Sequence, residues 1–94
     1  MTTYENLLTY VNSCVDDMNS SVDWARDKMK DKDHSFRINW ALDSIELEES
    51  KGHGACVFAS IYDETITDEQ YDELKAILHK AWCTARDRAF KEIH

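Results

Sequence analysis

The fold of this protein depends on residues 35–62, which read SFRINWALDSIELEESKGHGACVFASIY. In the first half of this stretch every second residue is apolar, namely Phe36, Ile38, Trp40 and Leu42. Side chains of a β-strand point alternately to its two faces, so this pattern predicts a half-buried strand. Beyond it the alternation shifts by one residue, which indicates a β-bulge near Asp43 and Ser44.

A turn and a second strand are expected next. The chain has no proline and only two glycines, Gly52 and Gly54, which fall together after the first predicted strand. Glycine adopts turn conformations readily, and the eight residues that follow are apolar at both parities, as in a strand covered on both faces. The sequence therefore predicts a β-hairpin with strands at about 35–49 and 55–62. Because an isolated hairpin is marginally stable, helices, a second copy or a partner must cover it.

The N-terminal segment predicts a long amphipathic helix. Its apolar residues follow helical spacing, namely Tyr4, Leu7, Leu8, Val11, Cys14, Val15, Met18, Val22, Ala25 and Met29. Thr2 and Glu5 fit a capping box at its start. The polar run at residues 19–21 favours a bend or a break, and the continuous apolar phase across it favours the bend.

A second helix is predicted at about residues 68–93. Thr67 and Gln70 fit a capping box, and acidic residues in the first turn suit the positive end of the helix dipole. The apolar stripe consists of Tyr71, Leu74, Leu78, Ala81 or Trp82, Ala85, Ala89 and Ile93. Helix, hairpin and helix together predict one small α+β domain over residues 1–94.

The negative charge of the chain is concentrated between residues 43 and 73. The formal net charge is −8, and this segment holds one base, Lys51, beside ten acids: Asp43, Glu46, Glu48, Glu49, Asp63, Glu64, Asp68, Glu69, Asp72 and Glu73. On a hairpin and the adjoining helix start, these carboxylates are expected to converge on one surface. Such a surface repels nucleic acid and attracts a basic protein partner, either as a general acidic docking surface or by standing in for nucleic-acid phosphates. The alternative is a solvated face that only keeps the protein soluble.

Trp24 is a further candidate partner contact. It falls off the apolar stripe of the first predicted helix and has Arg26 and Lys28 nearby. An exposed tryptophan is a common anchor at protein interfaces. Core packing is the other interpretation of this residue.

No catalytic motif is present, so we expect no enzyme, cofactor or metal. His53, Cys56, His79 and Cys83 are of the ligand type, but the chain lacks a Cys-x-x-Cys pair. Three widely spaced cysteines argue against a disulfide framework. The N-terminus lacks the pattern of a signal peptide, and no apolar run approaches about 20 residues, so we expect a cytoplasmic protein without a membrane partner.

In size, charge and predicted architecture the chain resembles the small phage-encoded inhibitors of host defence nucleases, including anti-CRISPR proteins. The resemblance implies a non-catalytic protein that masks a basic nucleic-acid-handling partner by electrostatic and steric occlusion. It carries over no functional residues. The alternative hypothesis is a homodimeric adaptor, or protein-interaction module, that binds through an apolar groove around the hairpin.

Overall fold

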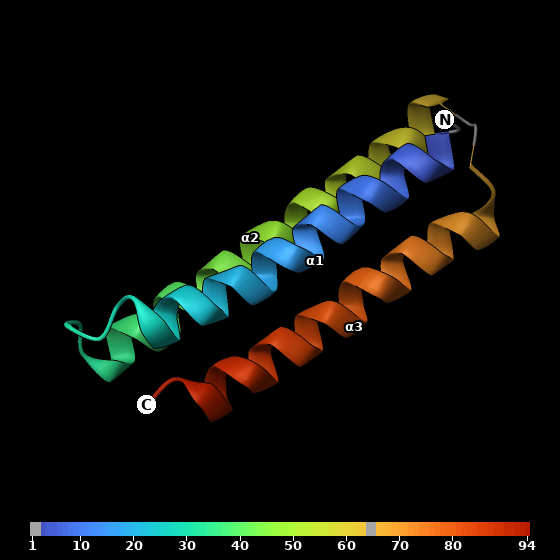
Figure 1. Ribbon diagram of the computed structural model, residues 1–94. Helices are drawn as coiled ribbons and strands as arrows, with labels where there is room; N and C mark the ends of the chain where they lie inside the picture. The colour runs from blue at the N-terminus through green and yellow to red at the C-terminus, as the bar shows by residue number, and fades with distance from the viewer. Residues whose placement is uncertain (1–2, 64–65) are drawn as a thin grey trace.

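A computed structural model of the chain describes residues 3–63 and 66–94, and these residues form three helices of equal length. They are α1 (Thr3–Asp27), α2 (His34–Phe58) and α3 (Asp68–Glu92), with a short π-helix η1 (Ala59–Asp63) extending α2. Figure 1 shows them side by side along the long axis of a molecule whose extents are 47 × 18 × 17 Å. Each helix packs on the other two.

The predicted N-terminal helix is confirmed, and it runs without a break. Two polar side chains in its middle bond back to the preceding turn: Asn19 Nδ2 donates to the Val15 carbonyl at 3.1 Å, and Ser21 Oγ donates to the Asp17 carbonyl at 2.9 Å. These bonds satisfy the two side chains within the helix, and the burial of Met18 and Val22 on either side of the run keeps α1 helical despite its poor helix propensity. Thr2, the predicted cap, lies outside the described residues.

The predicted C-terminal helix is also confirmed, together with its capping box. Thr67 Oγ1 accepts from the Gln70 amide at 3.1 Å, and Gln70 Oε1 accepts from the Thr67 amide at 3.0 Å. The two bonds satisfy backbone donors that the first turn of a helix leaves unpaired. The local sequence at residues 67–70 therefore fixes where α3 begins.

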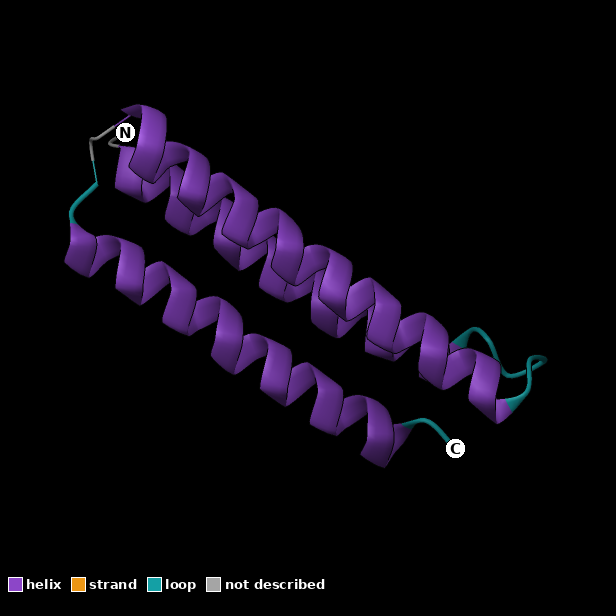
Figure 2. Cartoon of the chain, turned by 180° about the vertical axis from the view of Figure 1, so that it is seen from behind, coloured by secondary structure: helices purple, strands orange, loops and turns teal. Residues whose placement is uncertain are grey.

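The predicted β-hairpin is wrong, and with it the α+β fold class. Residues 34–58 form one continuous helix, and Figure 2 shows no strand anywhere in the part of the chain that the structure describes. Asp33 caps its start, because its side chain accepts from the Phe36 amide at 2.8 Å. Neither the bulge at Asp43 and Ser44 nor the glycine turn exists. The protein is a small all-α domain.

The error arose because α2 has apolar residues on two opposite faces. Its inner face contributes Ile38, Ala41, Ile45 and Cys56 to the core, whereas Phe36, Leu47 and Phe58 are exposed on the other side. Two helical stripes on opposite faces put apolar residues at 36, 38, 40 and 42, which imitates the two-residue period of a strand. Periodicity alone does not separate these cases, and glutamates at 46, 48 and 49 favour the helix.

The glycines serve the helix packing rather than a turn. Gly52 is buried, and a Cβ built on it would lie 2.5 Å from Leu78 Cδ2 of α3. Only glycine allows α3 to approach α2 this closely. Gly54 has nothing within 4 Å of its Cβ position and faces open space.

The core is one cluster along the axis of the bundle. Its fully buried larger side chains come from all three helices and from the residue after α3, namely Val11, Met18, Val22, Ile45, Cys56, Leu74, Leu78 and Ile93. The apolar stripes predicted for the first and last helices supply most of this cluster. The third face of the core comes from α2, which the sequence assigned to strands.

Candidate interaction surfaces

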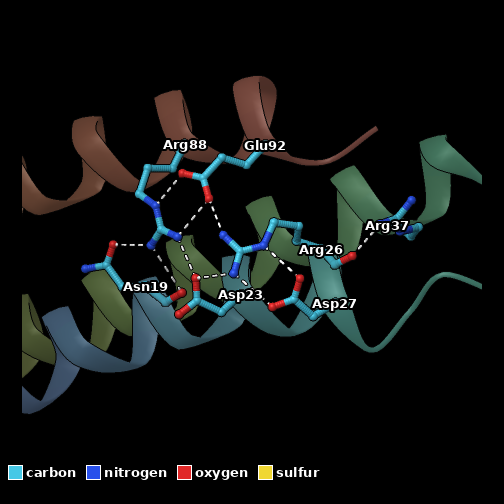
Figure 3. A network of polar contacts seen from close by, with 7 residues as sticks. All are labelled: Asn19, Asp23, Arg26, Asp27, Arg37, Arg88 and Glu92. Carbon is cyan, nitrogen blue, oxygen red and sulfur yellow. Dashed lines mark hydrogen bonds and ion pairs between the residues drawn. The ribbon is translucent and has the colours of Figure 1, made fainter.

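A polar network joins α1 to α3 at the end of the bundle where the chain terminates (Figure 3). Arg88 Nε donates to Glu92 Oε2 at 2.7 Å, and Arg88 Nη1 donates to Asn19 Oδ1 at 2.9 Å. Arg26 donates through Nε and Nη2 to the two Asp27 oxygens at 2.8 Å, and it also binds Glu92. Three contacts cross between the helices, namely Arg88 with Asn19, Arg88 with Asp23 at 2.5 Å, and Arg26 with Glu92, and these charge-assisted bonds link α1 to α3.

Two carboxylates of this network, those of Glu92 and Asp27, are held in their charged form. Hydrogen bonds from Arg88, joined by those from Arg26, lower the pKa of Glu92 to about 2. Hydrogen bonding to Arg26 likewise lowers the pKa of Asp27. Arg26 and Arg88 are hydrogen-bonded to carboxylates within the chain, so the network is a structural link between α1 and α3, which we call the α1–α3 clasp.

Arg37 closes the same end of the bundle from α2. Its guanidinium is buried and donates to three backbone carbonyls: Ala25 at 2.9 Å, Arg26 at 2.9 Å, and His94. The first two carbonyls belong to the last turn of α1, where orphan acceptors and the negative end of the helix dipole favour a cation. Arg37 therefore caps α1. A cavity of about 410 Å³ beside it is lined by Arg26, Asp27, Lys30, Arg37, Glu92 and His94.

The predicted acidic site residues fall into two groups along the bundle. The Gly52–Leu78 contact aligns the antiparallel helices α2 and α3. Counting from it, Glu49 and Glu73 are offset by eight residues, or about 12 Å at 1.5 Å per residue. Asp43 and Asp68 are offset by 19 residues, or about 29 Å. Both offsets exceed the screening length of about 8 Å at physiological salt, so the groups act as two separate fields.

Three of these acids are engaged within the chain. Glu48 lies 3.0 Å from Lys51 Nζ and, after burial, is the next cause that raises the pKa of the Cys14 thiol on α1. Glu73 accepts from the Tyr4 hydroxyl at 2.8 Å. Glu49 lies 3.5 Å from His53, and its Oε2 is buried without a hydrogen bond. Glu48 and Glu73 therefore point toward α1, and Glu49 belongs partly to the interior.

The other acids are available to solvent. Five are exposed and have no ion pair among the described residues: Asp43, Glu46, Asp68, Glu69 and Asp72. Asp63 is the last residue of η1, and Glu64 lies outside the described residues. The single anionic face expected from the sequence is thus replaced, over the described residues, by smaller acidic areas at two levels of the bundle.

Trp24 is exposed, as the partner-contact interpretation requires. It retains 55% of its accessible surface and borders a shallow cavity of about 190 Å³ with Ser20, Asp23, Asp27 and Lys28. The cavity is small and mostly lined by charged side chains. Trp24 stands alone there, since the other large exposed apolar side chains of α1 and α3 are Tyr10 and Phe90.

Most of the large apolar side chains exposed on the described chain lie on α2 and η1, and this grouping was not predicted from the sequence. Of nine large apolar side chains exposed on the described chain, six are here: Phe36, Leu47, Val57, Phe58, Ile61 and Tyr62. We refer to these six residues as the α2 outer face. A helix with apolar residues on opposite sides is typical of a buried helix, so the α2 outer face lacks a cover in the monomer.

Three members of the α2 outer face form a straight ridge. Phe36, Leu47 and Phe58 follow one another at intervals of eleven residues and are 51%, 56% and 63% exposed. Eleven residues make three turns of an α-helix to within about 20°, so the three side chains lie in line. Over 22 residues the ridge runs for about 33 Å. This eleven-residue spacing is the signal from which the surface could have been found in the sequence.

The ligand-type residues do not assemble. Cys56 is buried and Cys83 is exposed, and Cys83 Sγ lies 3.7 Å from His79 Nε2. In the described residues, no three His, Cys, Asp or Glu side chains are placed to hold a metal ion together. Across residues 3–63 and 66–94, none of the helices has both the length and the apolar composition needed to cross a membrane.

Comparison with known proteins finds no family model, curated protein or solved structure that matches this chain. The architectural part of the resemblance to small phage inhibitors rested on the predicted hairpin and is lost with it. Functional inference therefore depends on the surface of the protein itself.

Proposed function

We propose that this protein is a helical protein-interaction module that binds through the α2 outer face. The observation that supports this function is the ridge of Phe36, Leu47 and Phe58, each more than half exposed on a helix whose opposite side is core. The members of this ridge are about 16.5 Å apart along the helix. At its end Phe58 packs against Tyr62, with ring centroids 4.7 Å apart, next to the exposed Val57 and Ile61. Grouped exposed apolar side chains of this kind mark interaction sites on soluble proteins. The groove around a hairpin that the sequence suggested is replaced by a convex helix face.

The rest of the molecule fits a rigid support for this face. The three helices are clamped by the Arg26, Arg37 and Arg88 contacts at one end, and Gly52 locks the α2–α3 spacing near the middle. A partner therefore meets a preformed helix, which lowers the entropic cost of association.

Site-specific photocross-linking tests this proposal. A photoreactive amino acid replaces Leu47 in one variant and Phe90 of α3 in the control, because both residues are 56% exposed. We expect the photoreactive residue at position 47 to form several-fold more covalent adducts with a partner protein than the one at position 90. They should disappear when Phe36→Ser and Phe58→Ser are added. Equal labelling at the two positions would overturn the module.

Electrostatic docking to a basic, nucleic-acid-handling protein is the second candidate. It is supported by the five exposed acids without an ion pair in the described chain: Asp43, Glu46, Asp68, Glu69 and Asp72. Carboxylates that have no base within the chain can accept one from a partner, with a gain mainly in encounter rate and specificity. The two acidic areas would contact the partner separately.

Salt separates the two candidates. Binding through carboxylates weakens as salt rises and is reduced by Asp68→Asn with Asp72→Asn. Binding through the α2 outer face persists at high salt and is reduced by Leu47→Ser. Adducts that persist at high salt but vanish with Asp68→Asn and Asp72→Asn would contradict both assignments.

A further inference from the structure

We propose that the ridge of Phe36, Leu47 and Phe58 on the α2 outer face is covered by the same ridge of a second copy of this chain, packed antiparallel around Leu47. This inference rests on the proposed function and names the partner. It follows from the symmetry of the ridge, the charges beside it and the place of the one open glycine.

The ridge is symmetric about its middle residue. Phe36 and Phe58 lie eleven residues before and after Leu47. An antiparallel copy with its two-fold axis at Leu47 places Leu47 against its own equivalent and Phe36 level with Phe58 of the second copy. Two-fold interfaces require such self-complementarity, since every contact must occur twice. A ridge with bulky groups at equal distances from its centre meets that requirement.

The charges beside the ridge favour the antiparallel arrangement. Asp43 lies four residues before Leu47 and Lys51 four residues after it, both exposed. In the antiparallel pair, Asp43 is level with Lys51 of the second copy. Lys51 already lies 3.0 Å from Glu48 of its own helix, so Asp43 of the other copy adds a second carboxylate to this base on each side of Leu47. A parallel pair would bring Asp43 level with Asp43 and Lys51 level with Lys51, which is repulsive.

Gly54 supplies room for the bulkiest neighbour of the ridge. Seven residues from Leu47 on either side lie Trp40 and Gly54, so the antiparallel pair sets the half-buried Trp40 level with Gly54 of the second copy. Nothing lies within 4 Å of the Cβ position of Gly54. The indole of Trp40 therefore meets the open position beside Gly54 of the other copy. This contact gives a packing role to a glycine that nothing within one chain explains.

Sedimentation equilibrium of the purified chain is the first test. We expect a concentration-dependent dimer. Because each copy carries a net charge of −8, salt should strengthen the dimer by screening repulsion. Leu47→Glu, which sets two carboxylates at the two-fold axis, should weaken association at least tenfold. Phe90→Glu, at a residue of the same 56% exposure on α3, should leave it unchanged.

A charge swap and a distance measurement test the register. Asp43→Lys alone should weaken the dimer, and Asp43→Lys with Lys51→Asp should restore it. A spin label on Ser35→Cys, in a Cys83→Ala background, reports the direction of the helices, since Cys14 and Cys56 are buried. The antiparallel pair offsets the two labels by 24 residues, about 36 Å along the axis, whereas a parallel pair sets them side by side.

Each outcome has a defined meaning. A dimer with a label separation of several tens of ångströms that is weakened by Leu47→Glu and by Asp43→Lys, but not by Phe90→Glu, supports the proposal. A chain that stays monomeric at high concentration and high salt overturns it, and so does a short label distance. If that monomer still forms adducts from position 47 with another protein, the interaction module stands while the antiparallel homodimer fails. If neither forms, both proposals fail.

Discussion

The two faces of α2 are similarly apolar, yet they differ in almost everything that packing controls. Ile45 on the inner face is fully buried, and Leu47, two residues later, keeps 56% of its surface. Gly52 touches α3, whereas Gly54 touches nothing. The comparison shows that the sequence of a helix sets how many of its faces are apolar. Which of these faces becomes buried depends on where the neighbouring helices pack. In this bundle the inner face is covered by α1 and α3, whereas the outer face stays exposed, and the second copy proposed above would cover it.

The largest expected difference between the faces is in core truncation. Ile45→Ala should lower the free energy of unfolding by about 2–5 kcal/mol, because it removes buried atoms and leaves a cavity. Leu47→Ala should change it by less than about 0.5 kcal/mol at concentrations where the protein is monomeric. Urea denaturation of both variants measures the difference. Equal losses would mean that the outer face is packed within the chain.

Arg37 tests whether the inner side of α2 depends on polar contacts as well. Arg37→Met keeps much of the volume but removes the three hydrogen bonds to the Ala25, Arg26 and His94 carbonyls. We expect a loss of about 1–3 kcal/mol, since these acceptors must find water at a partly closed end. Lys32→Met is the control, because Lys32 is exposed with its nearest carboxylate 3.8 Å away. Thermal unfolding of both variants gives the comparison.

The two glycines give a smaller but opposite pair of effects. Gly52→Ala should destabilise the fold by about 1–2 kcal/mol, because the new Cβ overlaps the buried Leu78 and outweighs the helix propensity gained. Gly54→Ala should stabilise the monomer by about 0.5–1 kcal/mol, because the added methyl meets no other atom. Chemical denaturation at low protein concentration detects both. A stabilising Gly52→Ala would show that α2 and α3 are not in close contact there.

Acid should lower the stability of the fold by protonating Glu92, which links α3 to α1. Its pKa is lowered from 4.5 to about 2 by hydrogen bonds from Arg88 and Arg26, so its contribution is present above pH 4.5 and is lost as the pH falls toward 2. Glu92→Gln should flatten the dependence of melting temperature on pH in that window. Glu69→Gln, an exposed carboxylate on the same helix, should leave the dependence as it is. If the melting temperature of Glu92→Gln depended on pH as steeply as that of the original chain, the structural role of Glu92 in the α1–α3 clasp would be wrong.

The sequence predicted the two outer helices well and the middle one wrongly, for one physical reason. In α1 and α3 a single apolar stripe faces the core, so helical spacing is visible, and Thr67 with Gln70 fixes the start of α3. In α2 two stripes overlap in the sequence and cancel the helical signal. The acidic residues were identified correctly as a local excess of charge, but their spacing in space depended on the hairpin. Trp24 was placed off its stripe, and it is exposed.

The sequence by itself determined the charge, the capping box of α3 and the core-facing residues of α1 and α3, because these depend on neighbours within about four positions along the chain. Tertiary structure alone decided that residues 34–58 are a helix, which of their faces is core, and how far apart the acids lie. Those outcomes depend on contacts such as Gly52 with Leu78 and Arg37 with the end of α1, between residues distant in the chain. Long-range packing overrides local pattern where one segment is apolar on both sides.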